Sequence, residues 1–223
     1  MYIARLAQKF CKENKMEFLP ITKDGERVYA GFWKRFCAGF ADALIIMPLV
    51  FLFNWLEGFD RTLAIILTIL WSILFAMYTV YFNARFGGTL GKLAVGIRIT
   101  KPDGSRINWN DAWKRSSVDL VFASVALIFG VWGLTQVDPE GYASVGWMER
   151  GDMVMEHVPA WYATISILQQ VWIYSEVVVV LFNKRKRALH DFIAGTVVIH
   201  KKFAEQSPAP DSSPAAGSGT GEA

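Results

Sequence analysis

Three acidic residues lie within long apolar stretches of the sequence: Asp42, Asp119 and Glu176. A carboxylate inside hydrocarbon costs about 3 kcal/mol even on lenient insertion scales, so a membrane segment that contains one usually has a use for it. With a helical rise of about 1.5 Å per residue, each acid lies about 6–12 Å from the basic residues that border its apolar stretch. The three carboxylates are therefore predicted at comparable depths, where a shared polar cavity could bind a cation or take up protons.

A structural role explains the same residues. Arg35 and Asp42 are seven residues apart, and Arg115 and Asp119 are four apart, so each pair lies on one face of a helix. An arginine at the membrane edge can extend to the interface and pair with Asp42 or with Asp191, which would hold the helices together. The residues alone leave both interpretations open: an ion-binding cavity and a stabilising charge network.

The elements that must position these residues are membrane spans. Apolar residues make up 53% of the 223 residues, and the mean hydropathy is +0.27. Long apolar runs predict four transmembrane helices, at about 33–55, 62–82, 117–137 and 161–182. The predicted fold class is an all-α polytopic membrane protein, with the lipid bilayer as a partner.

Basic residues are concentrated on one side of these spans. Residues 1–35, 84–116 and 183–223 hold eight, seven and six of the 23 Lys and Arg residues, whereas the two other loops contribute only Arg61 and Arg150. Because cationic residues in short loops stay in the cytoplasm, both termini are predicted to be cytoplasmic. The net charge of +3 then reflects topology, and we expect no nucleic-acid partner.

The remaining segments differ in character. Residues 1–31 are expected to form a cytoplasmic amphipathic segment, residues 32–200 the membrane domain, and residues 201–223, where Pro, Ser, Gly and Ala dominate, a disordered tail. Alternating apolar residues predict a small cytoplasmic β element with strands at 97–100, 105–108 and 196–199. Asn108 or Asn110 is expected to cap the helix that leads into the third span.

Two parts of the chain are similar to each other. Trp-Lys-Arg occurs at 33–35 and at 113–115, and LGKLAVGIRI from Leu90 is similar to LHDFIAGTVVI from Leu189. A duplicated two-helix unit explains both similarities, and so does the usual preference for Trp and basic residues where a helix enters a membrane. Both explanations stay open.

The sequence lacks the residue patterns of common enzymes. It contains no Ser-His-Asp, HExxH or paired-cysteine arrangement, and its two cysteines do not form a metal-binding pattern. We therefore expect no enzymatic activity, no cofactor and no metal site.

Several motifs resemble those of the RDD family, a group of bacterial and archaeal inner-membrane proteins named for one arginine and two aspartates. They are Arg35, Asp42, the segment GTLGK from Gly88 and the segment RALHD from Arg187. The resemblance covers about residues 30–200, and it implies that Arg35, Asp42 and Asp191 are the named triad and that the protein lies in the bacterial cytoplasmic (inner) membrane. The family has no established molecular function, and transport of unidentified ligands has been suggested for it. The acidic loop at 138–160 departs from the family pattern.

Two functions are compatible with these features. The first is transport of a small ion or solute, with a proton or cation as ligand, by a polar cluster of Arg35, Asp42, Asp119, Glu176 and Asp191. A second copy of the chain is an expected partner, because four helices enclose little pathway. The alternative is a non-catalytic scaffold or regulatory subunit that binds another membrane protein. A water-sized cavity lined by the three intramembrane acids favours transport, whereas complete pairing of these acids favours the scaffold.

Overall fold

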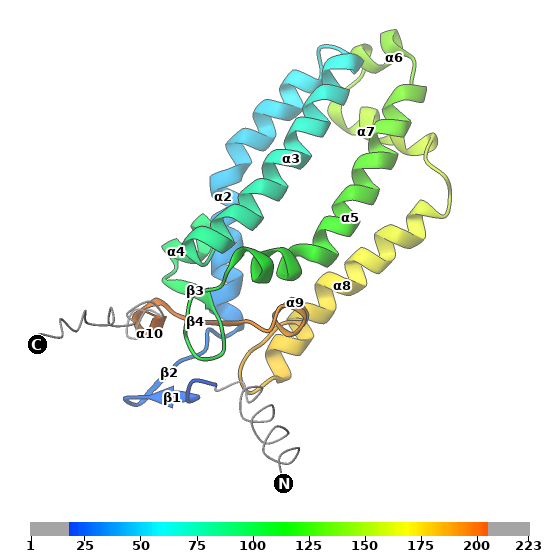
Figure 1. Ribbon diagram of the computed structural model, residues 1–223. Helices are drawn as coiled ribbons and strands as arrows, with labels where there is room; N and C mark the ends of the chain where they lie inside the picture. Colours follow the sequence, from blue (N-terminus) through cyan, green and yellow to red (C-terminus); the bar gives the residue numbers. More distant parts are fainter. Residues whose placement is uncertain (1–17, 205–223) are drawn as a thin grey trace, which may run out of the picture.

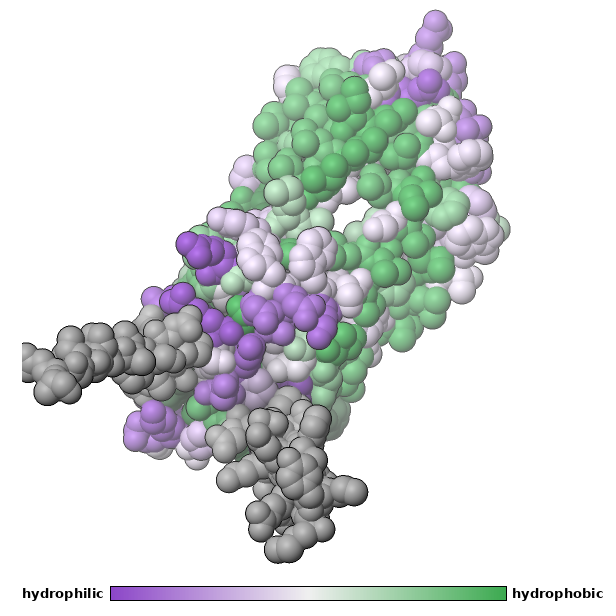
Figure 2. Space-filling model, in the orientation of Figure 1, coloured by the Kyte–Doolittle hydropathy of each residue, from purple (hydrophilic) through white to green (hydrophobic). Residues whose placement is uncertain are grey.

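Four long helices form the body of the protein. The computed structural model describes residues 18–204, and its long helices are α2 (Phe32–Glu57), α3 (Arg61–Phe86), α5 (Trp109–Gln136) and α8 (Tyr162–Phe182) (Figure 1). All four are long and apolar enough to cross a membrane. Their apolar side chains cover the middle of the molecule, and hydrophilic residues gather toward its two ends (Figure 2). The predicted fold class, an all-α membrane protein with four spans, is confirmed.

The third long helix starts earlier than the apolar run at 117–137 indicates. The Asn108 side chain accepts a hydrogen bond from the Asp111 backbone nitrogen at 2.9 Å, and the Asp111 side chain accepts one from the Asn108 nitrogen at 3.0 Å. This reciprocal cap satisfies two backbone donors at the helix start. Of the two caps that the sequence suggested, Asn108 is therefore the correct one, and α5 has two polar turns before its apolar part.

The short elements lie at opposite ends of the bundle. At one end, the predicted acidic loop at 138–160 contains two helices, α6 (Pro139–Ser144) and α7 (Trp147–Glu156) (Figure 1). The other end, which we call the strand end, carries α4 (Leu90–Ala94), β3 (Ile97–Thr100), α9 (Leu189–Ile193) and β4 (Val197–His200), together with a short hairpin of β1 (Thr22–Lys23) and β2 (Glu26–Arg27).

The two similar sequence segments fold alike and meet. Each forms a short helix followed by a strand, α4–β3 in the first and α9–β4 in the second. The strands pair antiparallel, with Ile97 opposite His200 and Thr100 opposite Val197. The side chains of Ile97 and Ile99, which belong to β3, are buried in an apolar core. This pairing brings α9, and with it Asp191, to the starts of α2 and α5.

Two expectations outside the spans need correction. The segment 105–108 forms no strand of its own and contributes only one isolated bridge, between Thr100 and Arg106, because the chain must turn there to reach the Asn108 cap. Residues 201–204, expected within the tail, form α10 (Lys201–Ala204), in which Phe203 is buried. The amphipathic segment predicted for the N-terminus lies largely outside the described residues, as does the rest of the predicted tail.

Candidate functional site

Asp191 is the centre of a buried charge network at the strand end. Its side chain is fully buried. Arg35 of α2 donates to Oδ2 at 2.9 Å, and Arg115 of α5 donates to Oδ1. The Ala188 backbone nitrogen also donates to Oδ2, at 2.9 Å, and Thr196 Oγ1 donates to Oδ1 at 3.2 Å. One carboxylate thus joins the first turn of α2 and the second turn of α5 to α9, and both of its oxygens accept hydrogen bonds.

The two arginines also hold the chain around Asp191. Arg35 Nη2 donates to the Lys186 carbonyl oxygen at 2.5 Å, and Arg115 Nη1 donates to Thr196 Oγ1 at 2.8 Å. Burial alone would raise the pKa of Asp191, but the positive charges of Arg115 and Arg35 lower it well below its usual range. Asp191 therefore stays ionised at neutral pH, and its charge balances the two guanidinium groups.

His190 and Glu176 extend this network toward α8. Arg115 Nη2 lies 2.5 Å from His190 Nε2, and because an arginine can only donate, this ring nitrogen must accept. The proton of the neutral imidazole is then on Nδ1, which donates to Glu176 Oε1. Burial and the positive charge of Arg115 lower the pKa of His190, against the opposing charges of Asp191 and Glu176. The network thus holds His190 in its neutral form.

The lowered pKa of His190 predicts that the protein loses stability on mild acidification. The unfolded chain takes up the proton near pH ~6.5, before the folded protein does, so the stabilisation is present above that pH and is lost as the pH falls below it. Asp191 adds nothing in this window, because its lowered pKa keeps it ionised until well below pH ~4. We expect the unfolding temperature in neutral detergent to fall between pH ~7 and pH ~5.5. His190→Gln, which keeps a donor and an acceptor, should flatten this slope, and equal slopes for parent and variant would contradict the assignment.

Asp42 makes a separate set of hydrogen bonds that fixes α4 against α2. Its Oδ1 accepts from the Tyr78 hydroxyl at 2.8 Å and from the Gly91 backbone nitrogen at 2.7 Å, and its Oδ2 accepts from Thr89 Oγ1 at 2.5 Å. The Leu90 nitrogen donates in turn to the Tyr78 hydroxyl at 3.0 Å. These contacts satisfy the carboxylate and the first backbone donors of α4, which is the arrangement of a structural anchor.

The close approach of α4 to α2 requires Gly91, so replacing it should be destabilising. A Cβ atom at this position would lie 2.6 Å from the Asp42 backbone nitrogen and would overlap the Ala38 carbonyl oxygen. Gly91→Ala is expected to lower the free energy of unfolding by about 1–3 kcal/mol, because the helices must move apart. Gly39→Ala is the matched control, since nothing lies within 4 Å of a Cβ there. Equal unfolding temperatures for the two variants would rule out the tight contact.

Asp119 lies one helical turn beyond Arg115, between α5 and α8. Its Oδ1 accepts a hydrogen bond from Trp172 Nε1 at 2.9 Å. Trp172 precedes Glu176 by four residues, so the two side chains lie on the same face of α8. Arg115 and Asp119 on α5 thus face Glu176 and Trp172 on α8, and together they form a polar row that runs from the strand end into the apolar part of the bundle.

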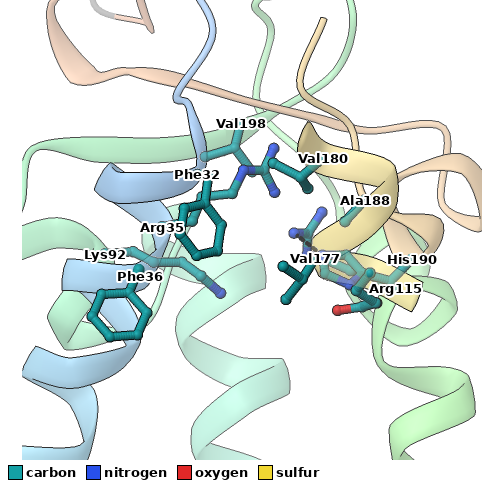
Figure 3. A pocket seen from close by; sticks show the side chains of 11 residues that line it. Phe32, Arg35, Phe36, Lys92, Arg115, Val177, Val180, Ala188, His190 and Val198 are labelled. Atoms are coloured by element: carbon teal, nitrogen blue, oxygen red, sulfur yellow. Dashed lines mark hydrogen bonds and ion pairs between the residues drawn. The ribbon is translucent and has the colours of Figure 1, made fainter. Parts of the chain in front are cut away.

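A cavity of about 220 Å³ opens beside this network. Arg35, Lys92, Arg115, Glu176 and His190 supply its polar lining, and its apolar wall consists of Phe32, Phe36, Val177, Val180, Ala188 and Val198 (Figure 3). Asp42 and Asp119 are not among the lining residues. The volume is sufficient for several water molecules or a small ligand. The cavity therefore brings a hydrogen-bonded, titratable pair, Glu176 and His190, together with three cationic side chains.

The structure divides the predicted polar cluster into parts. The expected contact between Arg35 and Asp191 is present, Glu176 lines the cavity, and Asp42 and Asp119 lie in separate hydrogen-bonded settings. The sequence interpretation did not place three further residues in the site: Lys92, Arg115 and His190. It noted Arg115 as a neighbour of Asp119 on one helical face. For Arg115 a signal existed, because its Trp-Lys-Arg context repeats that of Arg35, and the two arginines bind the two oxygens of one aspartate.

Comparison with known proteins supports the motif-based resemblance. The model of the RDD family matches residues 29–195, a range that contains Arg35, Asp42, Asp191 and every cavity residue except Val198. No curated protein and no solved structure matches the chain. Because the family match covers about three quarters of the sequence and includes all four long helices, this membrane protein belongs to the RDD family.

Proposed function

We propose that the protein moves protons, alone or together with a small ion or solute, across the membrane, and that Glu176 takes up the proton. One observation carries the proposal: Glu176 and its hydrogen-bonded partner His190 line a cavity large enough for water. Water in such a cavity can deliver a proton to the carboxylate of Glu176. An acid used only to hold helices together would have no need of the cavity.

The polar row between α5 and α8 supports a path beyond the cavity. Asp119 is the next acid along this row, and it lies one turn from Arg115 and opposite Trp172. Successive acids at the interface of two membrane helices are the usual components of a proton relay. The proposal therefore assigns proton entry to Glu176 and the next step to Asp119.

The membrane setting of the proposal follows from charge. The strand end carries most of the basic residues, so we assign it to the cytoplasm of a bacterial cell, with the cavity facing the cytoplasmic side of the inner membrane. We propose no catalytic reaction for the site. A second copy of the chain is proposed as a partner, because four membrane-spanning helices enclose little room for a pathway.

Reconstitution tests this function directly. The purified protein is placed in liposomes that contain a pH-sensitive dye, a pH difference is imposed, and the internal pH is followed. We expect equilibration faster than in protein-free liposomes by at least about tenfold, since an intact bilayer passes protons only slowly. The assay is repeated with Na⁺, with K⁺ and without either ion on both sides of the membrane. Equal rates of pH equilibration in liposomes with and without the protein, under all three conditions, would overturn the proposal.

A scaffold is the second candidate, and it also rests on a specific observation. Asp42 and Asp191, two acids of the family's named triad, have all their carboxylate oxygens in hydrogen bonds or ion pairs. Such a site holds helices in place without needing a ligand. A reconstituted protein that is folded but conducts no protons would favour this function.

A further inference from the structure

The cavity has the chemistry of an anion site as well as that of a proton site. We propose that it binds a phosphate group, with Lys92 as the main ligand, and that the apolar wall holds the chain attached to that phosphate. The inference rests on the proposed function in one respect, because it assigns a ligand to the same cavity. Binding is measured separately from flux, so either can fail alone.

Charge is the first argument. Three cationic side chains line the cavity, Arg35, Lys92 and Arg115, and Asp191 behind them is paired with both arginines. Glu176 is the only acidic side chain among the lining residues. His190 is held neutral and adds no positive charge. Counted over the lining residues and Asp191 alone, the site carries three positive and two negative charges. An anion that enters it compensates this charge beside side chains that are largely buried, where attraction between charges is stronger than in bulk water.

The lining residues differ in how many of their hydrogen-bond donors are free to bind an anion. The guanidinium groups already donate to Asp191, to the Lys186 carbonyl and to Thr196. Lys92, in contrast, makes no hydrogen bond or ion pair with any residue in the range 18–204 that the structure describes, and its ammonium group points into the cavity (Figure 3). An ammonium group with three free donors is a common phosphate ligand.

The position of Lys92 is fixed by its backbone. Asp42 accepts from the nitrogen of Gly91, the residue before Lys92, and from the Thr89 hydroxyl. These bonds hold α4 against α2 and set the point from which the lysine side chain extends. The family's first aspartate thereby positions the lysine without facing the cavity itself.

The apolar wall is the third argument. Phe32 and Phe36 come from α2, and Val177 and Val180 come from α8 (Figure 3). Phe36 and Val177 are 55% and 36% exposed, so they belong both to the wall and to the outer surface of the long helices. An acyl chain attached to the phosphate could therefore remain among the membrane lipids while its phosphate reaches Lys92. Phospholipid headgroups and free phosphate share this chemistry, and the test must separate them.

Calorimetric titration of the full-length protein in neutral detergent provides the test. The probes are short-chain phosphatidylglycerol, short-chain phosphatidylcholine and inorganic phosphate. Lys92→Gln should weaken phosphatidylglycerol binding at least about tenfold, as expected for the loss of one charge-assisted hydrogen bond.

Lys114→Gln is the matched control, because this exposed lysine lies next to Arg115 but does not line the cavity. It should change the dissociation constant by less than about twofold. Lys92→Arg should retain binding, which keeps the test decisive if Lys92→Gln is poorly folded.

The outcomes separate the sources of the phosphate. Tighter binding of phosphatidylglycerol than of inorganic phosphate, dependent on Lys92, supports the site with a lipid as its ligand. Binding of inorganic phosphate that depends on Lys92, without a gain for the lipid, supports it with a soluble phosphate. Phospholipid binding that Lys92→Gln leaves unchanged, equal losses in the two lysine-to-glutamine variants, or no binding of any probe would overturn it.

Discussion

Replacing Asp191 with asparagine is expected to lower the free energy of unfolding by about 3–5 kcal/mol, because it leaves two buried guanidinium groups without their counter-charge. Arg35 and Arg115 both lose their ion-pair partner, and neither can give up its proton to relieve the cost. Since whole proteins are stable by about 5–15 kcal/mol, such a loss removes a large part of the total. Thermal unfolding in neutral detergent measures it, together with the fraction recovered as a monodisperse species.

An exposed aspartate provides the matched control. Asp152 on α7 is exposed, and Asp152→Asn makes the same chemical change at the opposite end of the bundle. It should alter stability by less than about 0.5 kcal/mol. If Asp191→Asn unfolded at the same temperature as Asp152→Asn, the charge network at the strand end would have no stabilising role.

Replacing Glu176 with glutamine is expected to reduce proton flux at least tenfold, because an amide cannot take up and release a proton. The side chain keeps its size, and its carbonyl oxygen can still accept the hydrogen bond from His190 Nδ1. The change therefore removes the titratable group while leaving the geometry of the cavity nearly intact. The flux of each variant is measured in liposomes and normalised to the amount of folded protein.

Asp42→Asn distinguishes an anchor from a proton carrier. The carboxylate of Asp42 accepts hydrogen bonds from Tyr78, Thr89 and Gly91, and an amide retains only one of its two accepting oxygens. We expect a loss of about 1–3 kcal/mol in stability and an unchanged flux per folded molecule. A flux loss as large as that of Glu176→Gln would assign Asp42 to the transport path.

The membrane architecture follows from hydropathy, since a bilayer demands about 20 apolar residues per span. The four helices were predictable for this reason. The start of α5 was harder to predict, because it depends on the Asn108 cap and on two polar turns that carry no hydropathy signal. The strand expected at 105–108 does not form, because the same cap requires those residues for the helix entry.

The contents of the cavity were harder to predict, for a geometric reason. Position along a helix gives the depth of an acid in the membrane but not the direction in which its side chain points. Asp42, Asp119 and Glu176 lie on different helices, and they face α4, α8 and α9 respectively. Pairing of Arg35 with Asp191 was expected from the family motif, whereas the contact of Arg115 with the same aspartate depends on how α9 is placed by the β3–β4 pairing.

The most direct test compares Glu176→Gln and Asp42→Asn in one reconstitution experiment. Both variants neutralise one intramembrane acid, but only the first acid lines the cavity. The proposed mechanism predicts that Asp42→Asn conducts protons like the parent, within about twofold per folded molecule, while Glu176→Gln falls at least tenfold below it. Parent-like flux from Glu176→Gln would contradict the assignment of Glu176 as the proton acceptor.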